Sequence, residues 1–190
     1  MKKISVKFGV VVAIILIAAM SRIMPHPLNF SPLVAISLFG GAMFKQNWKA
    51  YLIPIGAYFV SDLLFQLMGQ QGFYGISQFF VYGSMLLVVL LGANMHQPKA
   101  VKVLGFTIAG STIFWIISNF GVWVASRVHG AIEYEPALTL GMTYLRALPF
   151  YNTFGNQLFF GSFIGDLFYS GLIFGTYALA QKRLPVLKSA

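Results

Sequence analysis

The chain has 190 residues, of which 58% are hydrophobic and 9% are charged. Soluble domains carry about 25% charged residues, so this composition excludes an ordinary soluble fold and indicates a protein surrounded by lipid. The net charge of +9 does not indicate a nucleic-acid binder, because the cations lie between apolar runs, and the lack of cysteine excludes disulfides and thiolate chemistry.

Six stretches of the sequence qualify as candidate membrane spans, for which about 20 apolar residues are needed. In chain order they are residues 8–24, 30–44, 51–68, 74–95, 103–125 and 154–180. The second is the shortest and begins at Ser31-Pro32, so we expect it to be tilted, broken or partly interfacial. The sequence therefore predicts an all-α polytopic membrane protein in which residues 1–190 form one domain with six transmembrane helices.

The positions of the lysines and arginines predict the orientation, because cytoplasmic loops carry an excess of these residues. Arg22, Arg127 and Arg146 fall on one side of the predicted spans. The other ten cations fall on the opposite side: Lys2, Lys3, Lys7, Lys45, Lys49, Lys99, Lys102, Lys182, Arg183 and Lys188. This split predicts cytoplasmic N- and C-termini in a bacterial inner membrane. A cleaved signal peptide over the first stretch is the alternative, which would leave five spans and disturb the alternation.

Residues 125–154 form a long external connection between the fifth and sixth predicted spans. Loops of this length are usually functional or disordered, and this one is too apolar for a disordered segment. Leu138, Met142 and Leu145 recur at helical spacing. We therefore predict a short interfacial helix that ends before Pro149 and caps the outer mouth of the bundle.

Ionisable side chains inside a span are costly, which makes them functional candidates. At helical rise, Asp62 lies about 16 Å above the inner end of its span, and Asp166 lies about 24 Å above Lys182. Arg22 lies about 22 Å above Lys7, close to the depth of Asp166. We therefore predict an ion pair between Arg22 and Asp166; the alternative is that these charges only lock helices together.

Aromatic, amide and charged side chains gather on the predicted outer side. Such a set is what a pocket for a small polar or aromatic ligand requires, and an interfacial aromatic belt with snorkelling arginines is the alternative. The candidate substrate-binding residues are Arg22, His26, Asn29, Asp62, Asn119, Trp123, Tyr144, Arg146, Asn152, Asn156 and Asp166. We expect no catalytic residue, cofactor or metal ligand set. His129 and Glu133, four residues apart, are a minor metal alternative that the intervening Gly130 disfavours.

Three segments of the chain resemble a bacterial family of small membrane proteins of unknown function. They are residues 22–44, the sequence Ser118-Asn119-Phe120-Gly121-Val122-Trp123, and Leu148-Pro149-Phe150-Tyr151-Asn152 continuing through Gly165-Asp166-Leu167. That family is in turn similar to the substrate-binding S components of energy-coupling factor (ECF) transporters, which capture vitamins or metal ions. The resemblance implies an external pocket under the first and fifth loops, and a partner module of one transmembrane subunit and two ATPases. Gly9 and Ala13 stand where many S components carry an alanine pair for docking that module.

We therefore expect a substrate-binding membrane component for the uptake of a small micronutrient such as a vitamin or a metal ion. Its expected partners are the lipid bilayer, an external small-molecule ligand and the energising module, with no nucleic acid. A non-transport scaffold or assembly protein is the second interpretation. An intramembrane enzyme is the third, because no nucleophile and base lie at one depth; such an enzyme would bring Asp62 and Asp166 to one substrate atom.

Overall fold

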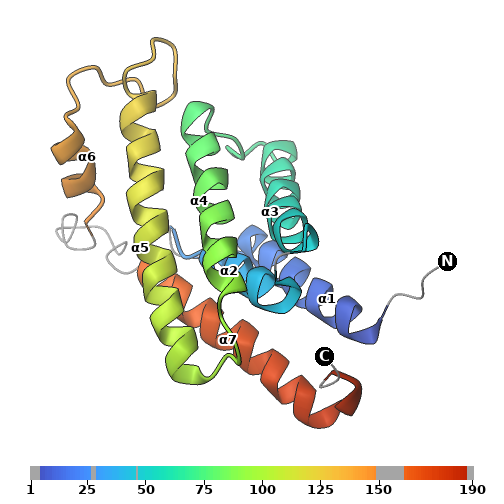
Figure 1. Cartoon of the computed structure of the whole chain (residues 1–190). Helices are drawn as coiled ribbons and strands as arrows, with labels where there is room; N and C mark the ends of the chain where they lie inside the picture. Colours follow the sequence, from blue (N-terminus) through green and yellow to red (C-terminus); the bar gives the residue numbers. More distant parts are fainter. Residues whose placement is uncertain (1–4, 27–28, 46, 149–160, 188–190) are drawn as a thin grey trace.

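The computed structural model of the chain describes residues 5–26, 29–45, 47–148 and 161–187, and within these ranges it contains helices and no strand. The predicted all-α class is therefore confirmed. In chain order the elements in Figure 1 are α1 (Val6–Met20), η1 (Ser21–Ile23), α2 (Leu33–Phe44), α3 (Lys49–Leu67), α4 (Ile76–Ala93), α5 (Ala100–Ala125), α6 (Leu140–Arg146), α7 (Gly161–Arg183) and η2 (Pro185–Leu187).

Five of the described helical segments are long and apolar enough to cross a bilayer: α1 together with η1, α3, α4, α5 and α7. They correspond to the first, third, fourth, fifth and sixth predicted spans, although residues 154–160 lie outside the described residues. The second predicted span contains the 12-residue helix α2. Its length of about 18 Å falls short of the roughly 30 Å of a hydrocarbon core. The structure thus supports a multi-pass membrane protein with five candidate spans, and a sixth crossing stays a prediction.

Helix α2 lies at the centre of the molecule. Every residue from Leu33 to Gly41 is buried, and α2 contacts α1, α3, α4, α5 and α7. In Figure 1, α3, α4 and α5 stand beside one another, α1 and α7 slant across below them, and α2 lies where the two groups meet. A helix that is apolar on all sides is one that protein or lipid surrounds completely. Because other helices surround α2, its short length is compatible with its central position.

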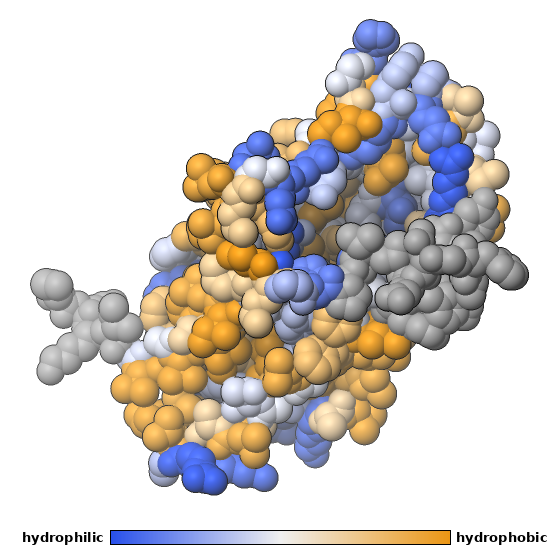
Figure 2. Space-filling view, turned by 180° about the vertical axis from the view of Figure 1, so that it is seen from behind, coloured by the Kyte–Doolittle hydropathy of each residue, from blue (hydrophilic) through white to orange (hydrophobic). Residues whose placement is uncertain are grey.

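The outward faces of the long helices are apolar. Ile17 on α1, Phe79 on α4 and Val101 on α5 are 72%, 77% and 82% exposed. Figure 2 shows hydrophobic residues over much of the body of one face, with hydrophilic residues gathered toward its upper end and its lower edge. A contiguous apolar surface of this kind is unfavourable in water and is what a surrounding bilayer requires.

Helices α2 and α4 cross in backbone contact through two glycines. A Cβ added at Gly92 would lie 2.4 Å from the carbonyl oxygen of Leu38, and one added at Gly41 would lie 2.2 Å from that of Val89. Neither position has room for a side chain. Small residues allow such close helix packing in membranes, where van der Waals contact stabilises the association of helices.

The predicted helix in the long loop is present as α6, but it does not cap the bundle. Among the described helices, α6 contacts α5 alone. Trp115 Nε1 on α5 donates a hydrogen bond to the carbonyl of Ala147 at 3.0 Å, and Tyr144 Oη on α6 donates to the carbonyl of Ile116 at 2.7 Å. The two aromatic rings also pack together, with centroids 5.1 Å apart. These contacts hold α6 on the flank of α5, so the predicted cap was wrong for the described residues.

We expect Gly92→Ala to lower the thermal midpoint of the protein purified in detergent, because the new Cβ would collide with the backbone of α2 and overpacking costs about 1–3 kcal/mol. Gly83→Ala is the matched control, since it lies on the same helix with nothing within 4 Å of the added Cβ. It should be neutral or slightly stabilising, because alanine favours helix more than glycine does. Equal midpoints for the two variants would contradict the close crossing.

Candidate functional site

The candidate site forms where α3 ends and the chain turns back into α4. Gly69 closes α3 with a φ of +75°, and its N–H bonds to the carbonyl of Gln66 at 3.2 Å. Glycine is the usual residue at this position, because the left-handed conformation is free of strain without a side chain. Gly72 then returns against α3, and an added Cβ there would lie 1.9 Å from the carbonyl oxygen of Asp62. This tight turn brings the first turns of α4 against Asp62.

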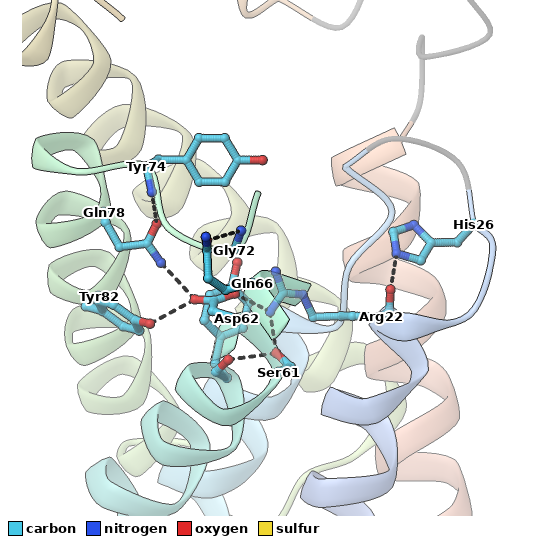
Figure 3. Close-up of polar contacts among 10 residues, drawn as sticks. Arg22, His26, Ser61, Asp62, Gln66, Gly72, Tyr74, Gln78 and Tyr82 are labelled. Carbon is cyan, nitrogen blue, oxygen red and sulfur yellow. Dashed lines mark hydrogen bonds and ion pairs between the residues drawn. The ribbon is translucent and has the colours of Figure 1, made fainter. Parts of the chain in front are cut away.

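Asp62 is 1% exposed and accepts hydrogen bonds on both carboxylate oxygens. Oδ1 accepts from Arg22 Nη1 at 2.7 Å, and Oδ2 accepts from Gln78 Nε2 and Tyr82 Oη at 2.8 Å each. Figure 3 shows these donors converging on the carboxylate from η1 and α4. We call Arg22, Asp62, Gln78 and Tyr82 the Asp62 network. It joins η1 to the consecutive helices α3 and α4.

Arg22 is positioned by stacking as well as by its ion pair. The guanidinium carbon lies 3.9 Å from the centroid of the Tyr58 ring, and Nη1 also donates to Ser61 Oγ. Cation–π contacts of this kind stabilise a cation that has been withdrawn from water. The preceding residue, Ser21, forms a hydrogen bond of 2.9 Å between its Oγ and Tyr169 Oη, which ties η1 to α7.

The predicted ion pair between Arg22 and Asp166 was wrong. Arg22 pairs with Asp62, whereas Asp166 accepts a hydrogen bond of 2.6 Å from Ser111 Oγ. The depth estimate placed Asp62 too low, because it counted from residue 51 although α3 begins at Lys49. Measured from Lys49, Asp62 lies about 20 Å along the helix, which nearly equals the depth estimated for Arg22.

The Asp62 network leaves part of the guanidinium available. Within the described residues, Arg22 makes its hydrogen bonds through Nη1 alone, and its side chain is 12% exposed. In Figure 3 its second terminal nitrogen points away from Ser61. A guanidinium presents its donors as a planar fork, so Nε and Nη2 can donate together to an acceptor that approaches from that side.

A second polar contact at the start of α4 involves the segment after α5. Ser77 donates a hydrogen bond to Glu133 Oε1, while Glu133 Oε2 is buried without a hydrogen-bond partner in the described structure. His129, the other residue of the minor metal alternative, packs its ring against Tyr134 with centroids 5.2 Å apart. Among the described residues no group of three or more potential His, Asp or Glu ligands could hold a metal ion.

The other predicted binding residues on α5 and α6 lie outside the Asp62 network. Asn119 donates to the carbonyl of Trp115 on its own helix at 2.8 Å. Arg146 pairs with Glu135 at 2.8 Å, and both side chains are about half exposed. Trp123 Nε1 is buried, and no hydrogen-bond partner for it is present in the described structure. Tyr144 faces α5, and Asn152 and Asn156 lie outside the described residues.

His26 and Asn29 lie in the connection between η1 and α2. His26 Nε2 is 2.9 Å from the carbonyl oxygen of Arg22, so the ring contacts the backbone of that residue and not its guanidinium. Asn29 is exposed and has a φ of 61°, a left-handed conformation that asparagine tolerates better than most residues. Of the predicted binding residues, the structure therefore brings Arg22 and Asp62 together, and His26 contacts the backbone of Arg22 away from that ion pair.

The sequence analysis missed Gln78 and Tyr82, which donate to Asp62, and Ser111, which donates to Asp166. Gln78 and Tyr82 are four residues apart in the fourth apolar stretch, a spacing that places both side chains on one helix face. That spacing is the signal that would have found them. No comparable pattern marks Ser111, because serine is common in membrane helices.

Two open surface grooves are lined mainly by apolar side chains and lie apart from the Asp62 network. One, of about 410 Å³, lies between α4 and α5 and is lined by Leu87, Leu90, Leu91, Asn94, Ile113, Ile116 and Ile117. The other, of about 400 Å³, is lined by Trp48, Tyr51, Leu52 and Ile55. Apolar grooves on the outside of a membrane bundle are suited to lipid chains, so the polar network is the better candidate site.

The chain belongs to a family of unknown function, DUF6580, which matches residues 2–187. No curated protein and no solved structure matches the chain. Membership of this family assigns no activity, and the similarity to S components stays a prediction.

We expect Asp62→Ala to destabilise the protein by about 3–5 kcal/mol, because it leaves the largely buried Arg22 cation without its counter-ion. Glu135→Ala is the control: it also removes one carboxylate from an arginine pair, but that pair is exposed and worth about 0–1 kcal/mol. Thermal unfolding in detergent compares the two. A loss for Asp62→Ala no larger than that for Glu135→Ala would contradict a role for the buried pair in holding η1, α3 and α4 together.

Proposed function

We propose that this protein is a solute-binding component of the bacterial cytoplasmic membrane, with six membrane crossings, both termini in the cytoplasm and no enzymatic activity of its own. It binds a small micronutrient, such as a vitamin or a metal ion, on the external side for uptake, as the S components of ECF transporters do. The ligand carries an acceptor group, such as the carboxylate of a vitamin, that contacts the guanidinium of Arg22, whereas a bare metal ion would be repelled there.

One observation carries this proposal. Arg22 is partly exposed and fixed in place at one end of an apolar bundle, and some of its N–H donors form no hydrogen bond within the described residues. Asp62, Ser61 and Tyr58 hold one edge and one face of the guanidinium. A donor group that is fixed before binding loses little conformational entropy when a ligand arrives. The low dielectric around it strengthens each hydrogen bond to a ligand.

The proposed energising partner is a module of one transmembrane subunit and two ATPases. Gly9 and Ala13, the residues expected to face such a module, lie on an exposed face of α1. Nothing lies within 4 Å of a Cβ added at Gly9, so no described part of the chain covers that position. Small exposed residues allow a second helix to approach closely.

A non-transport scaffold is the second candidate function. It is favoured by the hydrogen bonds that both carboxylate oxygens of Asp62 already accept from the protein. Its carboxylate already holds three donors from two elements, which is also the arrangement of a pair that serves only to lock helices together. The two functions differ in whether the free edge of Arg22 ever receives a ligand.

Mass spectrometry of small molecules released from the gently purified protein separates these functions. We expect the wild type to carry a small molecule that Arg22→Lys loses at least tenfold, because lysine keeps the charge for Asp62 but lacks the second donor edge. Arg183→Lys, at the end of α7, is the matched control and should retain the molecule. Both variants are first checked for a monodisperse elution profile.

The result that contradicts binding at Arg22 is a wild type without any co-purified molecule, or an equal amount of the molecule in Arg22→Lys and Arg183→Lys. Either outcome would favour the scaffold.

A further inference from the structure

Asp166 is a buried carboxyl group that has no cationic partner among the described residues. It is 5% exposed on α7, and within the described residues its side chain makes one hydrogen bond, from Ser111 Oγ on α5. Asp62, by contrast, has an arginine and two further donors. An ionised carboxylate in apolar surroundings is strongly unfavourable, so the charge of Asp166 has to be neutralised in some other way.

The charged side chains of the neighbouring elements lie too far along the bundle to neutralise the charge of Asp166. The elements packed against α7 are α1, α2, α5 and η2. Their charged groups, together with those of α7 itself, are Lys7, Lys102, Lys182 and Arg183, which lie near the other ends of their helices. Helix η1 is also tied to α7 by the hydrogen bond between Ser21 and Tyr169, but its cation, Arg22, pairs with Asp62. The nearest titratable neighbour on α7 is Tyr169, whose hydroxyl bonds to Ser21.

The hydroxyl groups around Asp166 behave differently from most of the other buried serine and threonine hydroxyls. Six of these bond to a backbone carbonyl three or four residues earlier in the chain, the usual arrangement in a helix. They are Ser37, Ser61, Ser84, Thr107, Ser126 and Thr143, whereas Ser77 donates to the carboxylate of Glu133. Ser111 bonds to Asp166 instead, and Ser170 Oγ is buried with no partner in the described structure.

Ser170 is placed to act together with Asp166. It is 1% exposed and lies four residues after Asp166 on α7, so the two side chains share one face of the helix. On the other side of Asp166, a Cβ added at Gly165 would lie 3.1 Å from Cα of Phe30, which shows how closely the segment before α2 covers this turn. Asp166, Ser111 and Ser170 are thus all buried, and within the described residues the Ser170 hydroxyl has no partner and the Asp166 carboxyl has one.

We propose that Asp166, Ser111 and Ser170 form a binding site for a monovalent cation, either a proton or Na⁺. Carboxylate and hydroxyl oxygens are hard ligands that suit such cations, and one positive charge is what the site lacks. When the cation is a proton, it rests on the carboxyl group of Asp166. When it is Na⁺, the carboxylate and the two hydroxyl oxygens coordinate it. The site is separate from the Asp62 network and does not depend on the proposed solute.

The test measures the thermal midpoint of the detergent-purified protein in NaCl and in choline chloride at equal ionic strength, between pH 5 and pH 9. Cation binding stabilises the folded state. In the sodium case, the midpoint rises by about 3–6 °C for each tenfold increase in Na⁺ at pH 8. In the proton case, the midpoint rises as the pH falls, independently of Na⁺, because the folded state binds the proton more tightly than the unfolded chain does.

In either case Asp166→Asn removes the dependence of the thermal midpoint on Na⁺ or on pH, since the amide resembles the neutral acid and carries no negative charge to bind a cation. Ser170→Ala shifts the response to a higher Na⁺ concentration or to a different pH, and it decides the question if Asp166→Asn does not fold. Ser37→Ala, which removes a carbonyl-bonded hydroxyl, keeps the wild-type response. A wild-type midpoint that responds to neither cation, a response that Asp166→Asn retains in full, or equal responses in Ser170→Ala and Ser37→Ala would overturn the proposal.

Discussion

The ion pair between Arg22 and Asp62 is the interaction on which the arrangement of this bundle depends. A charge that loses its partner in such surroundings costs several kcal/mol, so segments that supply the two charges have to stay together. The end of α1, the last turns of α3 and the first turns of α4 meet at this pair. Gly69 and Gly72 make the turn between α3 and α4 tight enough for α4 to supply two of the donors.

The two intramembrane aspartates have different surroundings, which points to different roles. Asp62 has its charge compensated by protein groups, and what remains available at that site is the donor edge of Arg22. Asp166 has no compensating charge in the described structure; it accepts a hydrogen bond from Ser111 and shares its helix face with Ser170, whose hydroxyl has no partner there. The first site is therefore suited to an acceptor on a ligand, and the second to a small cation.

The sequence predicted the helical class, the five long helices and the short helix in the last loop, because apolar stretches and helical spacing are local properties. It did not predict which charges pair, because a two-residue error in the start of α3 placed Asp62 about 3 Å too low, and at the corrected depth both aspartates lie about equally close to Arg22. It also did not predict that α2 is enclosed by other helices, since an apolar stretch has the same composition whether protein or lipid surrounds it. The four-residue spacing of Gln78 and Tyr82 could have predicted that both side chains share one helix face. The possible role of Ser111 and Ser170 follows only from the packing of α5 on α7, which the sequence does not show.

A double-mutant cycle over Arg22→Met and Asp62→Leu tests the central ion pair most directly. Each single variant leaves one charge unpaired, whereas the double variant removes both and replaces them with apolar side chains of similar volume. If the pair holds the bundle together as described, the double variant unfolds at a higher temperature than either single variant. A double variant whose loss of stability equals the sum of the two single losses would show that Arg22 and Asp62 do not interact in the folded protein.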